Sequence, residues 1–217
     1  IKPELQGVRL FGEAGVMTAA ATDSFRLAEK TVPLKSRGST PQIIIPARNS
    51  AELTRILESH SDTVDVYYDQ NQLSVQVGDV YYTTRLIDGS FPNYQQILPK
   101  DAATEAVVLR EDFSDALRLL QLFTDKFLQV SFLCDPKRKV VELSSHNQDI
   151  GEDTVTLKAA VSGEPVQMNF NSRYLADGVM PLTSESVRLK IQGPGKPLVM
   201  QDAADTSYLY LAMPMNR

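Results

Sequence analysis

The same pattern of hydrophobic and polar positions occurs three times along the chain. Residues 44–57, 107–120 and 166–179 each begin as the apolar end of a strand, pass through a short polar stretch and continue as an amphipathic helix. In each helix the apolar residues recur near the 3.6-residue period of one helical face. A run of alternating strands joined by tight turns follows each helix. The pattern therefore predicts an array built from one repeated helix-plus-strands unit.

The repeat predicts helices over residues 48–59, 110–122 and 171–180. Each helix is preceded by a strand end, and the strands expected after the helices are residues 64–68, 72–77, 79–85, 128–134, 139–144, 153–161, 187–192, 197–201 and 207–213. The helices start about 60 residues apart, a period that fits one helix with three or four strands. Helices combined with antiparallel strands make the predicted fold class α+β.

The opening residues depart from the repeat. Residues 7–11, 16–21 and 25–32 resemble the strand half of a unit whose helix is absent. We therefore expect the chain to be the C-terminal part of a longer architecture. If the repeated units pair, the chain forms two domains. We place the boundary between residues 1–99 and 100–217, because proline and small or polar residues interrupt the pattern there.

The composition is that of an ordinary soluble globular protein, with 217 residues, 42% hydrophobic and 23% charged. The net charge of −5 argues against a simple basic nucleic-acid binder, although a basic surface can exist within an acidic total. No run approaches the roughly 20 apolar residues of a membrane span, and the N-terminal sequence has no signal-peptide architecture. We therefore expect no membrane association.

The single cysteine, Cys134, excludes an internal disulfide framework and fits a reducing cytoplasm. With only His60 and His146 beside it, the usual zinc site cannot form, and we expect no metal or cofactor. We expect Cys134 to be a buried strand residue, with a reactive thiol as the alternative.

Familiar catalytic motifs are absent from the sequence, which contains no P-loop, GxSxG, HExxH or CxxC. The protein is therefore predicted not to be an enzyme. The alternative is a hydrolase or sugar-modifying enzyme that uses the carboxylates of Asp23 and Asp88, because paired acids can perform acid–base catalysis.

Three segments carry a specific likeness to a known family. ATDSFRLAE (residues 21–29), DGSFPNYQQILP (residues 88–99) and the terminal MPMNR (residues 213–217) resemble, in order and spacing, motifs of the bacterial DNA polymerase III beta subunit, the replicative sliding clamp. The usual patterns there are ATDGHRL, DGxFPDYxxVxP and a closing MPM. The likeness covers essentially the whole chain, without the family's first domain and the opening helix of its second.

The resemblance implies a ring around double-stranded DNA, built by two three-domain subunits head to tail, with helices lining the hole. Full-length protein is thus expected to be a homodimer, whereas this chain, lacking the first domain, is expected to be monomeric or weakly associating. A ring that moves along DNA should contact phosphates, which recur in any sequence. The candidate DNA-facing residues are Arg48, Arg55, Arg110, Arg118 and Arg173. Their alternative role is that of charges on solvated helix faces.

The resemblance also implies a pocket in which the polymerase III catalytic subunit, the clamp loader and other proteins with a clamp-binding motif dock a short, largely apolar peptide. The positions carried over are Leu5, Thr22, Arg26, Leu27, Pro92, Ile97, Phe127, Asn171, Tyr174, Leu198, Leu211, Met213, Pro214 and Met215. Methionine side chains repack around different ligands, which suits a receptor for several partners. The alternative for the MPM tail is a strand that closes its own core.

The chain departs from the family pattern at several pocket positions. Ser24 and Phe25 stand where Gly-His is common, so the pocket edge is expected to be bulkier. Gln96 occupies a position often filled by arginine, which weakens a charge-assisted contact with the peptide. Asn216 and Arg217 end the chain where some members have an apolar last residue.

Overall fold

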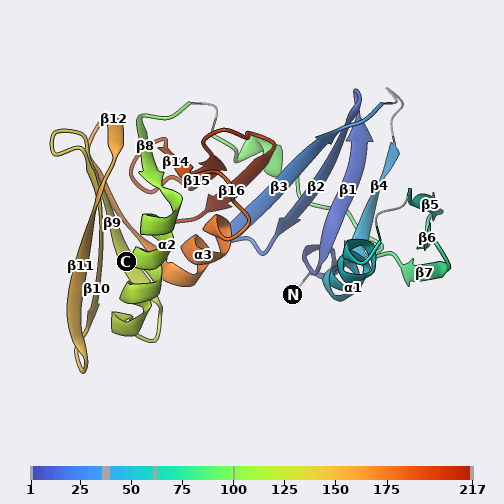
Figure 1. Cartoon of the computed structure of the whole chain (residues 1–217), viewed down its shortest axis with the longest axis horizontal. Helices are drawn as coiled ribbons and strands as arrows, with labels where there is room; N and C mark the ends of the chain where they lie inside the picture. The colour runs from blue at the N-terminus through green and yellow to red at the C-terminus, as the bar shows by residue number, and fades with distance from the viewer. Residues whose placement is uncertain (1, 36–39, 61–62, 100, 216–217) are drawn as a thin grey trace. The chain divides into compact units, whose positions relative to one another are not determined.

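The protein folds as two compact units, each built from helices packed on antiparallel strands. The computed structural model describes residues 2–35, 40–60, 63–99 and 101–215 (Figure 1). The first unit contains Ile1–Asp23 and Glu29–Asn93, and the second contains Ser24–Ala28 and Tyr94–Arg217. The α+β prediction is confirmed. The division between the units follows Asn93, and the short segment 24–28 packs with the second unit, which sequence spacing did not indicate.

The first unit contains two sheets and one α-helix. Its strands β3, β2, β1 and β4 are neighbours in one sheet, and β5, β6 and β7 form another. After the short 3-10 helix Pro3–Leu5, the elements are β1 (Gly7–Glu13), β2 (Val16–Thr22), β3 (Arg26–Pro33), β4 (Thr40–Pro46), α1 (Ala47–Glu58), β5 (Asp65–Tyr68), β6 (Gln72–Val77) and β7 (Val80–Arg85). These bounds match the predicted helix and strands closely.

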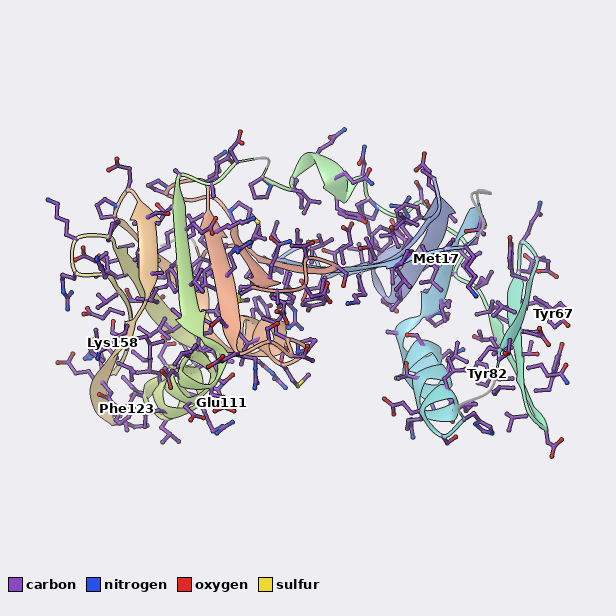
Figure 2. All side chains as sticks on the ribbon, turned by 45° about the horizontal axis from the view of Figure 1, so that its top comes forward. Met17, Tyr67, Tyr82, Glu111, Phe123 and Lys158 are labelled. Atoms are coloured by element: carbon purple, nitrogen blue, oxygen red, sulfur yellow. The ribbon has the colours of Figure 1, made fainter. Side chains whose placement is uncertain are left out.

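Alternation along β5–β7 decides which side chains of the first unit meet α1. Val66, Val75 and Tyr82 are directly opposite one another and share one face, from which the Tyr82 hydroxyl donates to the carbonyl of Asn49 in α1 at 3.1 Å. Tyr67 stands on the other face, away from α1, and is exposed (Figure 2). An apolar cavity of about 240 Å³ lies on the inner face, with lining residues from β1, β2, β4, α1, β5 and β6. Among the described residues, only β6 pairs with β5.

The second unit contains the other two repeats. Its elements, after the 3-10 helix Tyr94–Gln96, are β8 (Thr104–Leu109), α2 (Arg110–Leu120), the 3-10 helix Gln121–Phe123, β9 (Gln129–Asp135), β10 (Val140–Asn147), β11 (Gly151–Lys158), β12 (Ala160–Gly163), β13 (Val166–Asn171), α3 (Ser172–Val179), β14 (Ser186–Ile191), β15 (Leu198–Asp202) and β16 (Tyr208–Ala212). α2 and α3 lie side by side (Figure 1).

The two repeats of the second unit exchange their leading strands. β13, which leads into α3, pairs antiparallel with β9 of the preceding repeat. Conversely, β8, which leads into α2, pairs antiparallel with β14 of the following repeat. Each sheet therefore takes strands from both repeats, and the two repeats form one interlocked domain rather than a stack of independent units.

One large core lies between these sheets and the two helices. α2 contributes Phe113, Ala116, Leu117 and Leu120, all of them buried at the spacing of one helical face. Phe132 and Phe170, from paired strands, meet edge to face with ring centroids 5.9 Å apart. The amphipathic helix predicted from the sequence is therefore confirmed in its burial as well as in its position.

One predicted strand is wrong. The sequence predicted a continuous strand over residues 153–161, but the chain breaks at Ala159, whose amide donates to the carbonyl of Lys139 at 3.0 Å. β11 before the break pairs with β10, whereas β12 after it pairs with β8 in another sheet. The alternation of apolar and polar residues continues through a change of sheet, so it could not reveal the break.

None of the described helices is long and apolar enough to cross a membrane.

A glycine sets the distance between α3 and the strands beneath it. A β-carbon on Gly178 would meet Met200 Cε and would come within 2.5 Å of Tyr210 Cδ1. The substitution Gly178→Ala gains about 1 kcal/mol of helix propensity but overpacks a dense interface, which costs about 1–3 kcal/mol. We expect a net loss of about 1 kcal/mol in the free energy of unfolding, measured by urea denaturation. Arg173→Ala, on the exposed side of the same helix, is the control, and an unchanged or higher midpoint for Gly178→Ala would contradict this packing.

Candidate functional site

The C-terminal tail is fixed on two sides within the second unit. The amide of Met213 donates to the carbonyl of Phe25 at 2.8 Å, and the amide of Met215 donates to the carbonyl of Asn169, also at 2.8 Å. The tail thus lies between the segment 24–28 and strand β13. Met213, Pro214 and Met215 remain half-buried, so they offer an apolar surface as well as closing the core.

Arg26 joins the segment 24–28 to helix α3. Its Nη1 lies 2.5 Å from Oδ2 of Asp177, and its Cζ lies 4.5 Å from the centre of the Tyr174 ring. Tyr174 and Asp177 are three residues apart and therefore share one face of α3. The guanidinium face contacts the aromatic ring while its edge is paired with the carboxylate. Beside Arg26, Leu27 is buried and Phe25 is exposed.

The start of α3 is ordered by Asn171. As the N-cap, its side-chain oxygen accepts from the amides of Arg173 and Tyr174 at 3.0 and 3.3 Å. This satisfies helix-start donors that otherwise lack partners and fixes the backbone that carries Tyr174. On the preceding loop, Phe127 is 57% exposed and its ring lies 5.1 Å from Nζ of Lys126.

Leu198 and Leu211 lie on opposite faces of the β15–β16 strand pair. Leu198 is opposite Ala212 and belongs to the large core, whereas Leu211 is opposite Val199 on the other face. Both leucines are buried. Leu211 lies close to the half-buried tail in sequence and on the face opposite to that of Leu198, so it can form the floor of a site there. Leu198 can support such a site only from behind the sheet.

The remaining predicted pocket residues are divided between the two units. Leu5 and Thr22 are half-buried and Pro92 is exposed, each within the first unit. Gln96 and Ile97 belong to the second unit and are exposed, Ile97 to 52%. Asn216 and Arg217 lie outside the described residues.

Ion pairs hold several of the predicted DNA-facing arginines. Arg118 lies 2.9 Å from Asp115 on the same turn of α2, and Arg55 lies 3.8 Å from Glu52 on α1. Arg110 donates from Nε to the carbonyl of Ser184 at 3.1 Å, and Glu111 lies 3.7 Å away. Glu111, in the first turn of α2, is largely exposed (Figure 2). Arg48 and Arg173 are exposed. Acidic residues therefore alternate with the arginines on these helix surfaces.

The structure also shows the surroundings of the residues considered for a reactive thiol, for carboxylate catalysis and for metal binding. Cys134 is buried in β9, and burial raises the pKa of its thiol to about 12, which opposes formation of a reactive thiolate. Asp23 and Asp88 are both exposed and both belong to the first unit. Among the described residues, no group of three His, Cys, Asp or Glu side chains could hold a metal ion.

Sequence reasoning missed Asp177 and the backbone of Ser24. Asp177 lies about 150 residues from Arg26 along the chain, and no local pattern reveals such a pair. Ser24 has φ 78°, a left-handed conformation that glycine adopts without steric cost. The replacement of the family's Gly-His by Ser24-Phe25 was a usable signal, because glycine at a fixed position often marks positive φ.

We expect Ser24→Gly to raise the free energy of unfolding by about 0.5 kcal/mol, because removal of left-handed strain outweighs the added freedom of the unfolded chain. The measurement is the urea midpoint of the whole chain. Ser24→Val is the matched control and should lower that midpoint, since a β-branched side chain is disfavoured at positive φ. A lower midpoint for Ser24→Gly would show that the serine side chain contributes more than the backbone strain costs.

Two family models match consecutive parts of the chain. Residues 1–93 match the model described as DNA polymerase III beta subunit, central domain, and residues 95–216 match the one for the C-terminal domain of the same subunit. The chain is 29% identical to the beta sliding clamp of Synechococcus elongatus over 221 residues, covering 99% of this chain and 58% of the relative. The chain thus spans less than two thirds of that relative's length.

Solved structures agree with this assignment. The sliding clamp of Bacillus subtilis is 26% identical and superimposes with a TM-score of 0.94, over 100% of this chain and 58% of that one. A Pseudomonas aeruginosa clamp bound to griselimycin, 23% identical, has a TM-score of 0.92 over 99% of this chain and 58% of that one, which shows the shared fold. The family resemblance noted in the sequence is confirmed: the chain belongs to the DNA polymerase III beta subunit family.

Proposed function

We propose that this chain is the central and C-terminal part of a sliding clamp, a non-catalytic ring that encircles duplex DNA and tethers polymerases. The observation that carries the proposal is the consecutive match of two beta-subunit domains along the chain, together with a shared fold. We propose further that the residues 1–99 and 100–217 act as two domains of a three-domain subunit and that the full-length protein is a homodimer in the cytoplasm.

The ring would hold DNA through its phosphates, without reading sequence. Arg48 and Arg173 are the first candidates, because both are exposed on the helices that follow β4 and β13. Arg55 and Arg118 are paired with acids on their own helices, but exposed ion pairs of this kind contribute only about 0–1 kcal/mol, so a phosphate can compete for them. Arg110 is the most constrained, since it also donates to a backbone carbonyl.

Topological binding to DNA tests the ring directly. The subunit extended by its N-terminal domain, loaded on nicked circular plasmid, should stay bound through gel filtration in high salt and should leave when the plasmid is linearised. Salt weakens phosphate contacts but cannot open a closed ring on a circle, which is why retention should depend on DNA topology. The 217-residue chain is the control and should not be retained. Equal loss from circular and linear DNA would contradict the proposal.

The partner site would lie on the tail surface of the second unit. Half-buried Met213, Pro214 and Met215 directly follow β16 with its buried Leu211, and the tail is hydrogen-bonded to the backbone of exposed Phe25, whose neighbour Arg26 contacts the ring of Tyr174. Such a surface suits a short apolar segment, because several side chains of the segment can bury apolar area against it while few polar groups lose contact with water. A clamp of this fold binds griselimycin in P. aeruginosa. Leu5, Thr22, Pro92, Gln96, Ile97, Phe127, Asn171, Asn216 and Arg217 stay candidates for the same site.

The two faces of β15–β16 allow a sharp test of this site. A fluorescent peptide carrying a polymerase's clamp-docking segment should bind Leu211→Ala more weakly than the parent chain by over about 1 kcal/mol, as expected when an anchor pocket is truncated. Met213→Ala should behave in the same way. The measurement is the dissociation constant from fluorescence polarisation.

Two matched variants separate loss of the site from loss of stability. Leu198→Ala removes the same buried atoms from the opposite face of the strand pair, and Met180→Ala removes an exposed methionine outside the tail surface. Both should bind the peptide like the parent chain. Equal weakening by Leu198→Ala and Leu211→Ala would show that a general loss of packing, and not this surface, controls binding.

A further inference from the structure

Arg26 brings a positive charge next to the tail surface. Arg26 is a guanidinium beside a surface otherwise formed by methionine, proline and aromatic side chains, and its side chain is 30% exposed. A free arginine there would project into solvent or demand an acidic ligand. In this structure one face of α3 contacts the guanidinium.

Two residues of α3 contact the guanidinium of Arg26. Tyr174 provides an aromatic face 4.5 Å from Cζ, and Asp177 provides a carboxylate oxygen 2.5 Å from Nη1. The carboxylate neutralises the edge of the guanidinium, so the stacked group behaves as a flat surface of low net charge. A planar guanidinium can place its face on the ring while its edge donates to the carboxylate, a geometry that the compact ammonium of lysine does not reproduce.

The position of Arg26 also fixes the backbone beside it. The carbonyl of Phe25 accepts the amide of Met213, which ties the same segment to the tail. A chain of contacts therefore runs from α3 through Arg26 and Phe25 to the methionines of the tail. Asp177 lies at one end of this series of contacts, and the tail lies at the other.

We propose that Asp177 is a positioning residue of the partner site, which holds Arg26 flat on Tyr174 and so gives the site its preference for apolar segments. This proposal rests on the proposed function. Asp177 also lines an open cavity between α2 and α3 together with Arg110 and Arg118. The competing role, an acid that only balances charge on the helix surface, predicts no effect on peptide binding.

The test uses the 217-residue chain, the fluorescent apolar peptide and a second version of that peptide with one added glutamate. Asp177→Asn should raise the dissociation constant of the apolar peptide roughly three- to tenfold, as expected when a partly exposed charge pair and a cation–π contact are disturbed. It should also shift the binding preference toward the acidic peptide, because the guanidinium of Arg26 then no longer pairs with the carboxylate of Asp177. A purely structural role of Asp177 would not reverse this preference.

Arg26 variants make the test independent of general stability. In an Arg26→Met background, which has no guanidinium to position, Asp177→Asn should change neither affinity nor preference. Arg26→Lys should weaken binding of the apolar peptide about as much as Asp177→Asn does. This variant replaces Asp177→Asn in the test if Asp177→Asn does not fold. Unchanged affinity in both Asp177→Asn and Arg26→Lys would overturn the proposal.

The outcomes also separate this inference from the proposed function. Suppose that the parent chain binds the apolar peptide and that Leu211→Ala weakens this binding. If Asp177→Asn then leaves the affinity unchanged, only the role proposed for Asp177 is wrong. If the parent chain does not bind the peptide at all, the partner site and the role of Asp177 are both wrong.

Discussion

The exchange of leading strands between the two repeats is the constraint on which the second unit depends. β13 completes the sheet of the preceding repeat while β8 completes the sheet of the following one, so neither sheet exists without both repeats. α3 starts where β13 ends, capped by Asn171, and its position over β16 follows from that pairing. The tail, Arg26 and Tyr174 are brought together only because this frame is complete. The candidate site is therefore a property of the pair of repeats and not of either one.

The sequence predicted the elements well because their cause is local. One short stretch of sequence contains the apolar period of α2, which places Phe113, Ala116, Leu117 and Leu120 on one face of the helix. A period of this kind predicts a helix without any information from distant residues. The strands of the hairpins follow from alternation and turn residues in the same way. The motifs at residues 21–29, 88–99 and 213–217 predicted the family, which the domain matches confirm.

What the sequence could not predict is non-local. The change of sheet at Ala159 leaves alternation intact, so a single strand was the natural expectation. The opposite orientations of Leu198 and Leu211 depend on strand register, which a shift of one residue would reverse. The pairing of Arg26 with Asp177 joins positions from different repeats. Each of these features is decided by tertiary packing, which leaves no periodic signal in the chain.

The exchange of leading strands also has a consequence for the rate at which the second unit folds. Val108 of β8 pairs with Val187 of β14, which lies a whole repeat later in the chain. Contacts between positions so far apart require a long loop to close before the hydrogen bonds between the strands can form, and folds rich in such contacts fold slowly. A partly synthesised chain that ends before β14 therefore leaves β8 without this partner, and the sheet is completed only when the following repeat is present.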